Sequence, residues 1–101
     1  MTIRSEQRDK NCFMIFLSGR LDTTSASMNE GELKRLVDGT TDVILDLKDL
    51  TYISSSGLHI LLQLQKIMNN GKRKFVIKNM GEAVRSIFEM TGFINLITQE
   101  E

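Results

Sequence analysis

Short runs of apolar residues along this 101-residue chain predict its strands. The run CFMIFLS, which begins at Cys12, is apolar at both alternating positions, as in a strand that is covered on both faces. Two further runs, DVILDL from Asp42 and KFVIK from Lys74, are expected to be buried strands of the same sheet. Weaker alternation predicts an edge strand over Thr2–Arg8, and FINLI, from Phe93, predicts a last short strand.

Three segments with helical spacing of apolar residues lie between these strands. Gly19 is expected to end the first long strand, and LDTTSA then offers polar side chains that can cap a helix running to about Asp38. The segment Leu58–Met68 carries a wide apolar stripe, and the NNG that follows is a stop signal. A third helix is predicted over NMGEAVRSIFEMTG, which Asn79 is expected to cap and Gly92 to end.

The order of these elements, β-β-α-β-α-β-α-β, predicts an α/β fold. Alternation of strands and helices favours a mixed, largely parallel sheet of four to five strands, with right-handed crossovers and packed helices. A chain of 101 residues can build one hydrophobic core and is too short for two. We therefore expect a single domain over residues 1–101.

Composition and charge exclude several classes of function. Thirteen basic residues balance thirteen acidic ones, and the largest basic cluster is Lys72–Lys74, so nucleic-acid binding is not expected. The longest fully apolar run, FMIFL, is far shorter than the roughly 20 residues that span a bilayer, and no signal peptide opens the chain. We expect a cytoplasmic protein without membrane insertion. Cys12 and His59 are the only residues of their kinds, which excludes an internal disulfide and favours neither a metal site nor a cofactor.

The stretch TYISSSGLHILLQLQK, from Thr51, places three serines and a glycine where a strand gives way to a helix. In the structural interpretation, one serine caps the helix and Gly57 eases the turn. In the functional interpretation, the serines belong to a polar site. Because the carboxyl ends of neighbouring parallel strands meet at one edge of a sheet, we expect Asp22, Thr23 and Ser55 to lie near one another.

Other chemistries for the serine stretch have weaker support in the sequence. A nucleophilic pair of Ser55 and His59 would lack both the G-x-S-x-G elbow and a carboxylate that orients the histidine. A phosphate-binding loop would need the GxxxxGK[ST] pattern, which is absent. Anions could still bind passively at the helix amino terminus, and a phosphorylated serine would be tolerated there for the same electrostatic reason.

Together these segments resemble a known family. DLKDLTYISSSGLHILLQLQK, followed by NNGKRKFVIKNMGEAVRSIFEMTGF and preceded by GRLDTTSA, is similar to the STAS domains, particularly the bacterial anti-sigma factor antagonists. The usual loop of that family reads Asp-Ser-(Ser/Thr)-Gly-Leu. Residues Ser55, Ser56, Gly57 and Leu58 match its last four places, whereas Ser54 stands where the family has aspartate.

The resemblance implies a binding protein and no enzyme. Such an antagonist binds an anti-sigma factor that is also a serine-protein kinase, and thereby frees a sigma factor. The kinase would phosphorylate Ser55, with Ser54 and Ser56 as alternative acceptors, and a PP2C-type phosphatase would restore binding. The implied partner-binding residues are Asp22, Thr23, Ser54, Ser55, Ser56, Gly57 and Leu58. Because Ser54 removes the family's negative charge, the alternative is an unphosphorylated STAS binding or scaffold module in another bacterial signalling complex or a lipid-transport complex.

Overall fold

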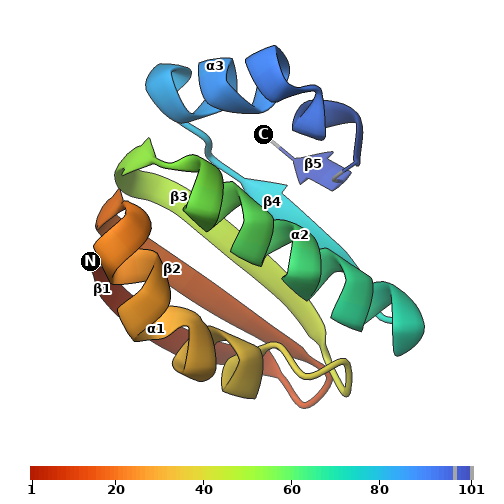
Figure 1. Ribbon diagram of the computed structural model, residues 1–101. Coiled ribbons are helices and arrows are strands. Elements are labelled where there is room, and N and C mark those ends of the chain that lie inside the picture. The colour runs from red at the N-terminus through yellow and green to blue at the C-terminus, as the bar shows by residue number, and fades with distance from the viewer. Residues whose placement is uncertain (97, 101) are drawn as a thin grey trace.

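Five strands form one sheet in the computed structural model, which describes residues 1–96 and 98–100 (Figure 1). Their order across the sheet is β1-β2-β3-β4-β5; β1 is antiparallel to β2, and the other neighbours are parallel. The predicted mixed, largely parallel sheet is thereby confirmed. The strands are β1 Thr2–Asp9, β2 Cys12–Leu21, β3 Asp42–Ile53, β4 Phe75–Lys78 and β5 Thr98–Glu100.

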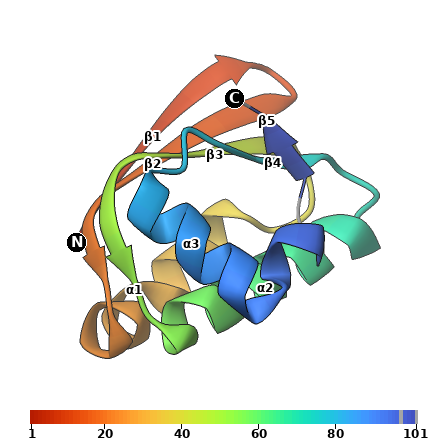
Figure 2. The ribbon, with the colours of Figure 1, turned by 90° about the horizontal axis from the view of Figure 1, so that it is seen from above.

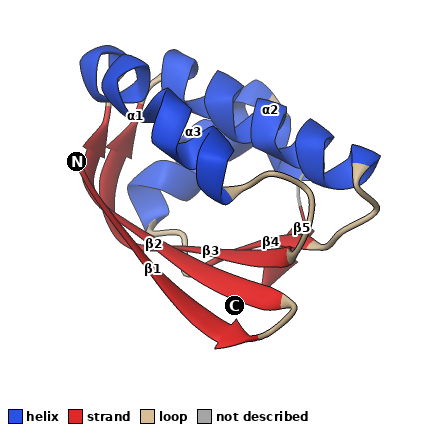
Figure 3. Cartoon of the chain, turned by 90° about the horizontal axis from the view of Figure 1, so that it is seen from below, coloured by secondary structure: helices blue, strands red, loops and turns tan. Residues whose placement is uncertain are grey.

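Three helices pack on the same face of this sheet (Figure 3). They are α1 Thr23–Leu36, α2 Ser55–Asn70 and α3 Glu82–Thr91. The apolar stripe of α2 is buried, as its spacing predicts, and α2 lies beside α1 when viewed from above (Figure 2). Within the described ranges, no helix is long and apolar enough to cross a membrane. The core between the layers is made chiefly of aliphatic side chains, among them Ile15, Leu17, Leu45, Leu47, Leu61, Leu64 and Met68, with Phe88 from α3.

Strands β2 and β3 are longer than the sequence predicts. Gly19 does not end β2: it adopts a positive φ of 91°, and the strand continues to Leu21. Strand β3 likewise continues through KDLTY to Ile53. The pairing of β2 with β3 shifts register between Phe16 and Ser18 and again between Gly19 and Arg20. An irregularity of this kind admits an extra residue and bends the strand without ending it. The consequence is that the ends of the two strands, Leu21 and Ile53, are paired side by side.

The start of α3 differs from the prediction. Its N-cap is Gly81, with no side-chain cap, so the expectation that Asn79 caps this helix is wrong. The Asn79 side chain instead donates a hydrogen bond from Nδ2 to Oδ2 of Asp46, at 3.1 Å. Asp46 is a buried carboxylate, and a buried charge needs hydrogen-bond donors more than an exposed helix end needs a cap. Gly92 does end α3 in the left-handed conformation, as predicted.

The segment after α3 was expected to be a strand. Phe93–Leu96 form a short 3₁₀ helix, η1, and β5 begins only at Thr98, so the prediction of a strand over FINLI is wrong for those four residues. The physical reason is that Phe93 and Ile94 pack against the core where α3 ends, which a tight helical turn allows and an extended chain does not. Ile97, the last residue of FINLI, lies outside the described residues.

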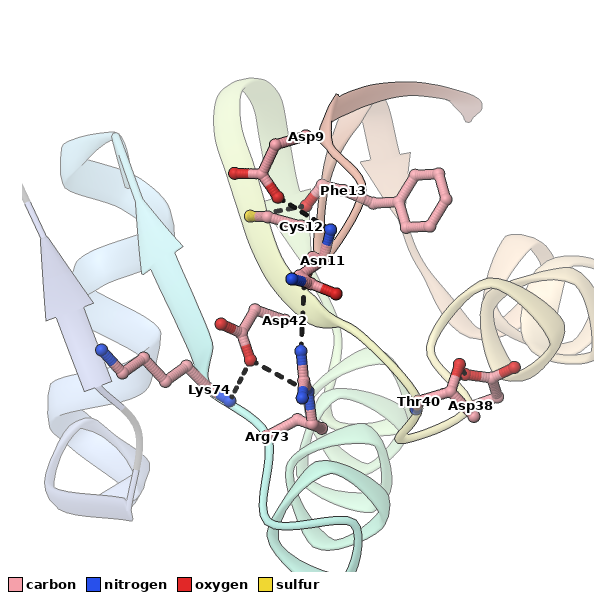
Figure 4. A network of polar contacts seen from close by, with 9 residues as sticks. All are labelled: Asp9, Asn11, Cys12, Phe13, Asp38, Thr40, Asp42, Arg73 and Lys74. Carbon is pink, nitrogen blue, oxygen red and sulfur yellow. Dashed lines mark hydrogen bonds and ion pairs between the residues drawn. The ribbon is translucent and has the colours of Figure 1, made fainter.

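A polar network ties the loops at the end of the sheet where the parallel strands begin (Figure 4). The carboxylate of Asp42 accepts a hydrogen bond from the backbone N–H of Lys74 at 3.1 Å and forms an ion pair with Nε of Arg73, also at 3.1 Å. Arg73 in turn donates from Nη2 to the backbone oxygen of Asn11 at 3.3 Å. This network joins three loops that are far apart in sequence and so fixes the end of the sheet opposite the serine stretch.

Candidate functional site

The paired ends of β2 and β3 place the starts of α1 and α2 next to each other. The backbone N–H of Ser54 donates to the carbonyl oxygen of Leu21 at 2.8 Å, and the Thr51 hydroxyl donates to the carbonyl oxygen of Gly19 at 2.9 Å. Helix α1 begins at Thr23, two residues after Leu21, and α2 begins at Ser55. Both helix amino termini therefore lie at the same edge of the sheet (Figure 1).

The three serines of the stretch have different environments. Ser54 is the N-cap of α2: its backbone is extended, and its Oγ accepts a hydrogen bond from the N–H of Gly57 at 3.2 Å. Ser55 is the first residue of the helix and is exposed, whereas Ser54 and Ser56 are half-buried. The prediction that one serine caps the helix is confirmed for Ser54. Ser55 is thus the serine whose side chain is most open to another molecule.

Gly57 is buried because the first turn of α2 packs directly on the end of β2. A Cβ atom at this position would lie 2.8 Å from Cγ of Leu21, 2.9 Å from the carbonyl oxygen of Leu21 and 3.0 Å from Cγ1 of Ile53. Only glycine permits this approach without displacing a neighbour. The next residue, Leu58, is also buried. The structure therefore places both residues in the interior, where they hold the serine turn in position.

Asp22 is the N-cap of α1 and forms a capping box with Ser25. The Asp22 carboxylate accepts hydrogen bonds from the backbone N–H of Ser25 at 2.9 Å and from its hydroxyl at 3.0 Å, while the Asp22 N–H donates to the Ser25 Oγ at 2.9 Å. The backbone hydrogen bond, followed by the side-chain one, lowers the pKa of Asp22 below its usual value. Asp22 is therefore ionised at neutral pH and fixes the direction in which Thr23 enters α1.

Replacing Asp22 by asparagine is expected to flatten the dependence of stability on acid pH. A carboxyl whose pKa is lower in the folded than in the unfolded chain stabilises the fold above the unfolded pKa, and this contribution is lost as pH falls through the folded pKa. Thermal melting from neutral pH to about pH 3 should thus show a steeper fall in Tm for the wild type than for Asp22→Asn. Asp38, whose pKa Thr40 lowers, is present in both proteins, so parallel curves would contradict the role given to Asp22.

A groove of about 420 Å³ lies between the amino-terminal parts of α1 and α2. Thr23, Ser55 and Ser56 all line this groove, so the structure brings Thr23 and Ser55 together as the topology predicts. Asp22 and Ser54 are not among its lining residues and serve as helix caps. The lining residues are Thr23, Ala26, Ser27 and Glu30 from α1, and Ser55, Ser56, His59 and Ile60 from α2.

Half of this lining was missed in the sequence. Ser27 and Glu30 follow Thr23 by four and seven residues, and Ile60 follows Ser56 by four, which is the spacing of one helical face. The signal was therefore present as periodicity from each cap. It could be used only once the two helix starts were known to be adjacent, because periodicity alone does not say which face of a helix meets a neighbour.

The groove has the chemistry of a contact surface. The Glu30 carboxylate accepts a hydrogen bond from Nζ of Lys34 at 2.7 Å, and Nε2 of His59 lies 3.0 Å from Nε2 of Gln63 on its own helix. The Glu30 carboxylate is thus paired with Lys34, and His59 contacts Gln63. Among the described residues, His59 therefore has no carboxylate partner that would orient it to activate a serine nucleophile. Across the part of the chain that the structure describes, no three His, Cys, Asp or Glu side chains gather as metal ligands.

Comparison with known proteins identifies the chain's relatives. A family model described as the STAS domain matches residues 3–101. BtrV of Bordetella bronchiseptica, which carries the provisional name of an anti-sigma factor antagonist, is 36% identical over 81 residues, covering 79% of this chain and 70% of that protein. The anti-sigma-B factor antagonist of Staphylococcus aureus is 26% identical over 102 residues, covering 100% of this chain and 94% of that protein.

Solved structures agree on the fold. The anti-sigma factor antagonist SpoIIAA of Bacillus, in its unphosphorylated form, superposes with a TM-score of 0.80 at 18% identity, over 99% of this chain and 89% of that one. The predicted α/β fold is confirmed. Both of these proteins are named as antagonists of an anti-sigma factor. Because the family model matches residues 3–101, the chain belongs to the STAS domain family.

Proposed function

We propose that this protein is an anti-sigma factor antagonist that binds its anti-sigma factor through the groove between α1 and α2. The observation that carries the proposal is the position of Ser55: it is exposed, it is the first residue of α2, and it lines the groove. The names of the relatives supply the class of partner. Binding of the anti-sigma factor would release the sigma factor that it holds, in the cytoplasm.

The unmodified groove offers hydrogen bonds from a rigid support. The hydroxyls of Thr23, Ser55 and Ser56 can each donate and accept hydrogen bonds with a partner. Thr23 and Ser55 stand at the starts of helices that other side chains already cap, so little conformational entropy is lost when the partner binds. The docking surface is therefore ready in the free protein.

Phosphorylation of Ser55 is the proposed switch. It adds a charge of about −1.5 to −2, which the amino terminus of α2 tolerates because the helix dipole is positive there. The first turn of α2 contains no acidic residue that would oppose the new charge. None of the described residues that line the groove is Lys or Arg, and Glu30 is already paired with Lys34, so a desolvated partner surface would meet the phosphate as an unpaired charge. Binding is lost while the fold is kept, and a PP2C-type phosphatase would restore it.

Ser54, which replaces the aspartate of the family, is consistent with this switch. Its Oγ caps α2 through Gly57 N–H, and serine and aspartate are about equally good N-caps. The turn that presents Ser55 therefore needs no carboxylate at this position. Ser54 is half-buried and its Oγ accepts the hydrogen bond from Gly57 N–H, and Ser56 is also half-buried. Both facts support Ser55 as the residue that accepts the phosphate.

Incubation with the cognate serine kinase and ATP, followed by mass spectrometry, tests the proposal. We expect one phosphate per chain, on Ser55, and none on the Ser55→Ala variant. The variants Ser54→Ala and Ser56→Ala serve as matched controls and should still be phosphorylated. Tight binding to the kinase without phosphate on any of the three serines would contradict the switch and favour a constitutive STAS module. Capture of other signalling or lipid-transport subunits in place of an anti-sigma factor would overturn the proposed partner.

A further inference from the structure

Gly31 lies in the interior of α1 without a structural reason for being glycine. It is exposed, its φ is not positive, and a Cβ atom built on it would meet nothing within 4 Å. Glycine in a helix interior is destabilising relative to alanine because it loses more conformational freedom on folding. The isolated fold therefore accepts a cost at this position and gains no packing from it.

Met28 lies beside Gly31 and is one of two large apolar side chains that the described structure leaves exposed, with 79% of its surface accessible. Thr24, Ser27, Met28 and Gly31 are spaced three and four residues apart, so they share one face of α1, and all four are exposed. We call these four residues the α1 face. An unbranched, flexible methionine is well suited to fill an irregular apolar cleft in another protein.

We propose that the anti-sigma factor extends from the groove onto the α1 face, where Met28 enters an apolar cleft of the partner and Gly31 allows its backbone to approach closely. This inference rests on the proposed function. Ser27 belongs both to the groove lining and to the α1 face, so the two surfaces are continuous. The partner chemistry that fits is an apolar cleft flanked by groups that form hydrogen bonds with the Thr24 and Ser27 hydroxyls.

The second exposed methionine provides a matched control. Met90 is 85% exposed and lies on α3, and it is not part of the groove lining. A partner held by the groove and the α1 face is not expected to need Met90. Truncating Met28 or Met90 to alanine removes the same atoms from similarly exposed positions in two helices, so only the location differs.

The test compares Gly31→Ala, Met28→Ala and Met90→Ala for affinity to the anti-sigma factor and for Tm. Gly31→Ala should raise the Tm by roughly 4 °C or more, because alanine favours the helix and nothing obstructs its Cβ, and yet weaken binding about tenfold or more. Met28→Ala should weaken binding about tenfold with an unchanged Tm. Met90→Ala should change neither quantity.

The outcomes separate this inference from the proposed function. If Gly31→Ala and Met28→Ala bind as tightly as the wild type while Ser55→Asp does not bind, the α1 face is not part of the footprint and the proposed function stands. If Met90→Ala weakens binding as much as Met28→Ala, the location is wrong and the inference is overturned. If the wild type itself fails to bind an anti-sigma factor, both proposals fail.

Discussion

Gly57→Ala is expected to destabilise the protein by about 1–3 kcal/mol and to weaken partner binding, because it overpacks the contact between α2 and β2. The new methyl group would lie 2.8 Å from Cγ of Leu21 and 2.9 Å from its carbonyl oxygen. That oxygen accepts the hydrogen bond from Ser54 N–H, so relief of the clash must shift the cap of α2. Urea denaturation measures the loss of free energy, and titration with the anti-sigma factor measures the loss of affinity.

Gly31→Ala is the matched control for this prediction. Both variants add one methyl group to a helical glycine, but nothing surrounds Gly31, whereas Gly57 is enclosed. The free energy of unfolding should therefore rise in Gly31→Ala and fall in Gly57→Ala. Equal stability of Gly57→Ala and the wild type would show that α2 can move away from β2 at no cost, which contradicts the fixed serine turn.

Ser55→Asp is expected to reduce affinity for the anti-sigma factor by roughly 30-fold or more with little change in Tm. A charge left unpaired in a desolvated interface costs about 2–5 kcal/mol, and none of the described residues that line the groove is a Lys or Arg that could pair with it. The folded domain itself should tolerate the change, because Ser55 is exposed at a helix amino terminus. Affinity by calorimetry and Tm by circular dichroism are the two measurements.

Two control variants separate charge from the loss of a hydroxyl. Ser55→Ala removes the hydrogen bond without adding charge and should bind within a few-fold of the wild type. Ser54→Asp places a charge on the cap, outside the groove lining, and restores the family's residue, so it should bind well. A Ser55→Asp variant that binds as tightly as the wild type would show that charge is not what closes this surface.

Most of the fold could be predicted from the sequence because the strands and helices follow apolar periodicity and cap residues. The errors arose where long-range contacts overruled a local signal. Gly19 predicts the end of a strand, but β2 continues to Leu21 because its last residues pair with β3. Asn79 is predicted to cap α3, but its side chain donates a hydrogen bond to the buried carboxylate of Asp46. Phe93 is predicted to lie in a strand, but it packs against the core just after α3 ends.

The site could be predicted only in part. The serine stretch and Thr23 follow from the rule that loops after neighbouring parallel strands share one edge of the sheet. Glu30 was missed because its place in the groove depends on which face of α1 packs beside α2, and no local sequence pattern specifies that packing. The resemblance to the family selects Ser55 as the acceptor, but the local pattern does not say which of the three serines caps the helix. The hydrogen bond from Gly57 N–H to Ser54 Oγ identifies the capping serine, and the burial of each side chain identifies Ser55 as the exposed one.

The central claim is that phosphorylation of the exposed Ser55 hydroxyl decides whether another protein can dock on this surface. The most direct test is a calorimetric titration of the anti-sigma factor with two preparations of the wild-type chain, one unmodified and one phosphorylated only on Ser55. The account predicts tight binding for the first and at least a 30-fold loss of affinity for the second, with the loss reversed by a PP2C-type phosphatase. Equal affinities of the two preparations would contradict it.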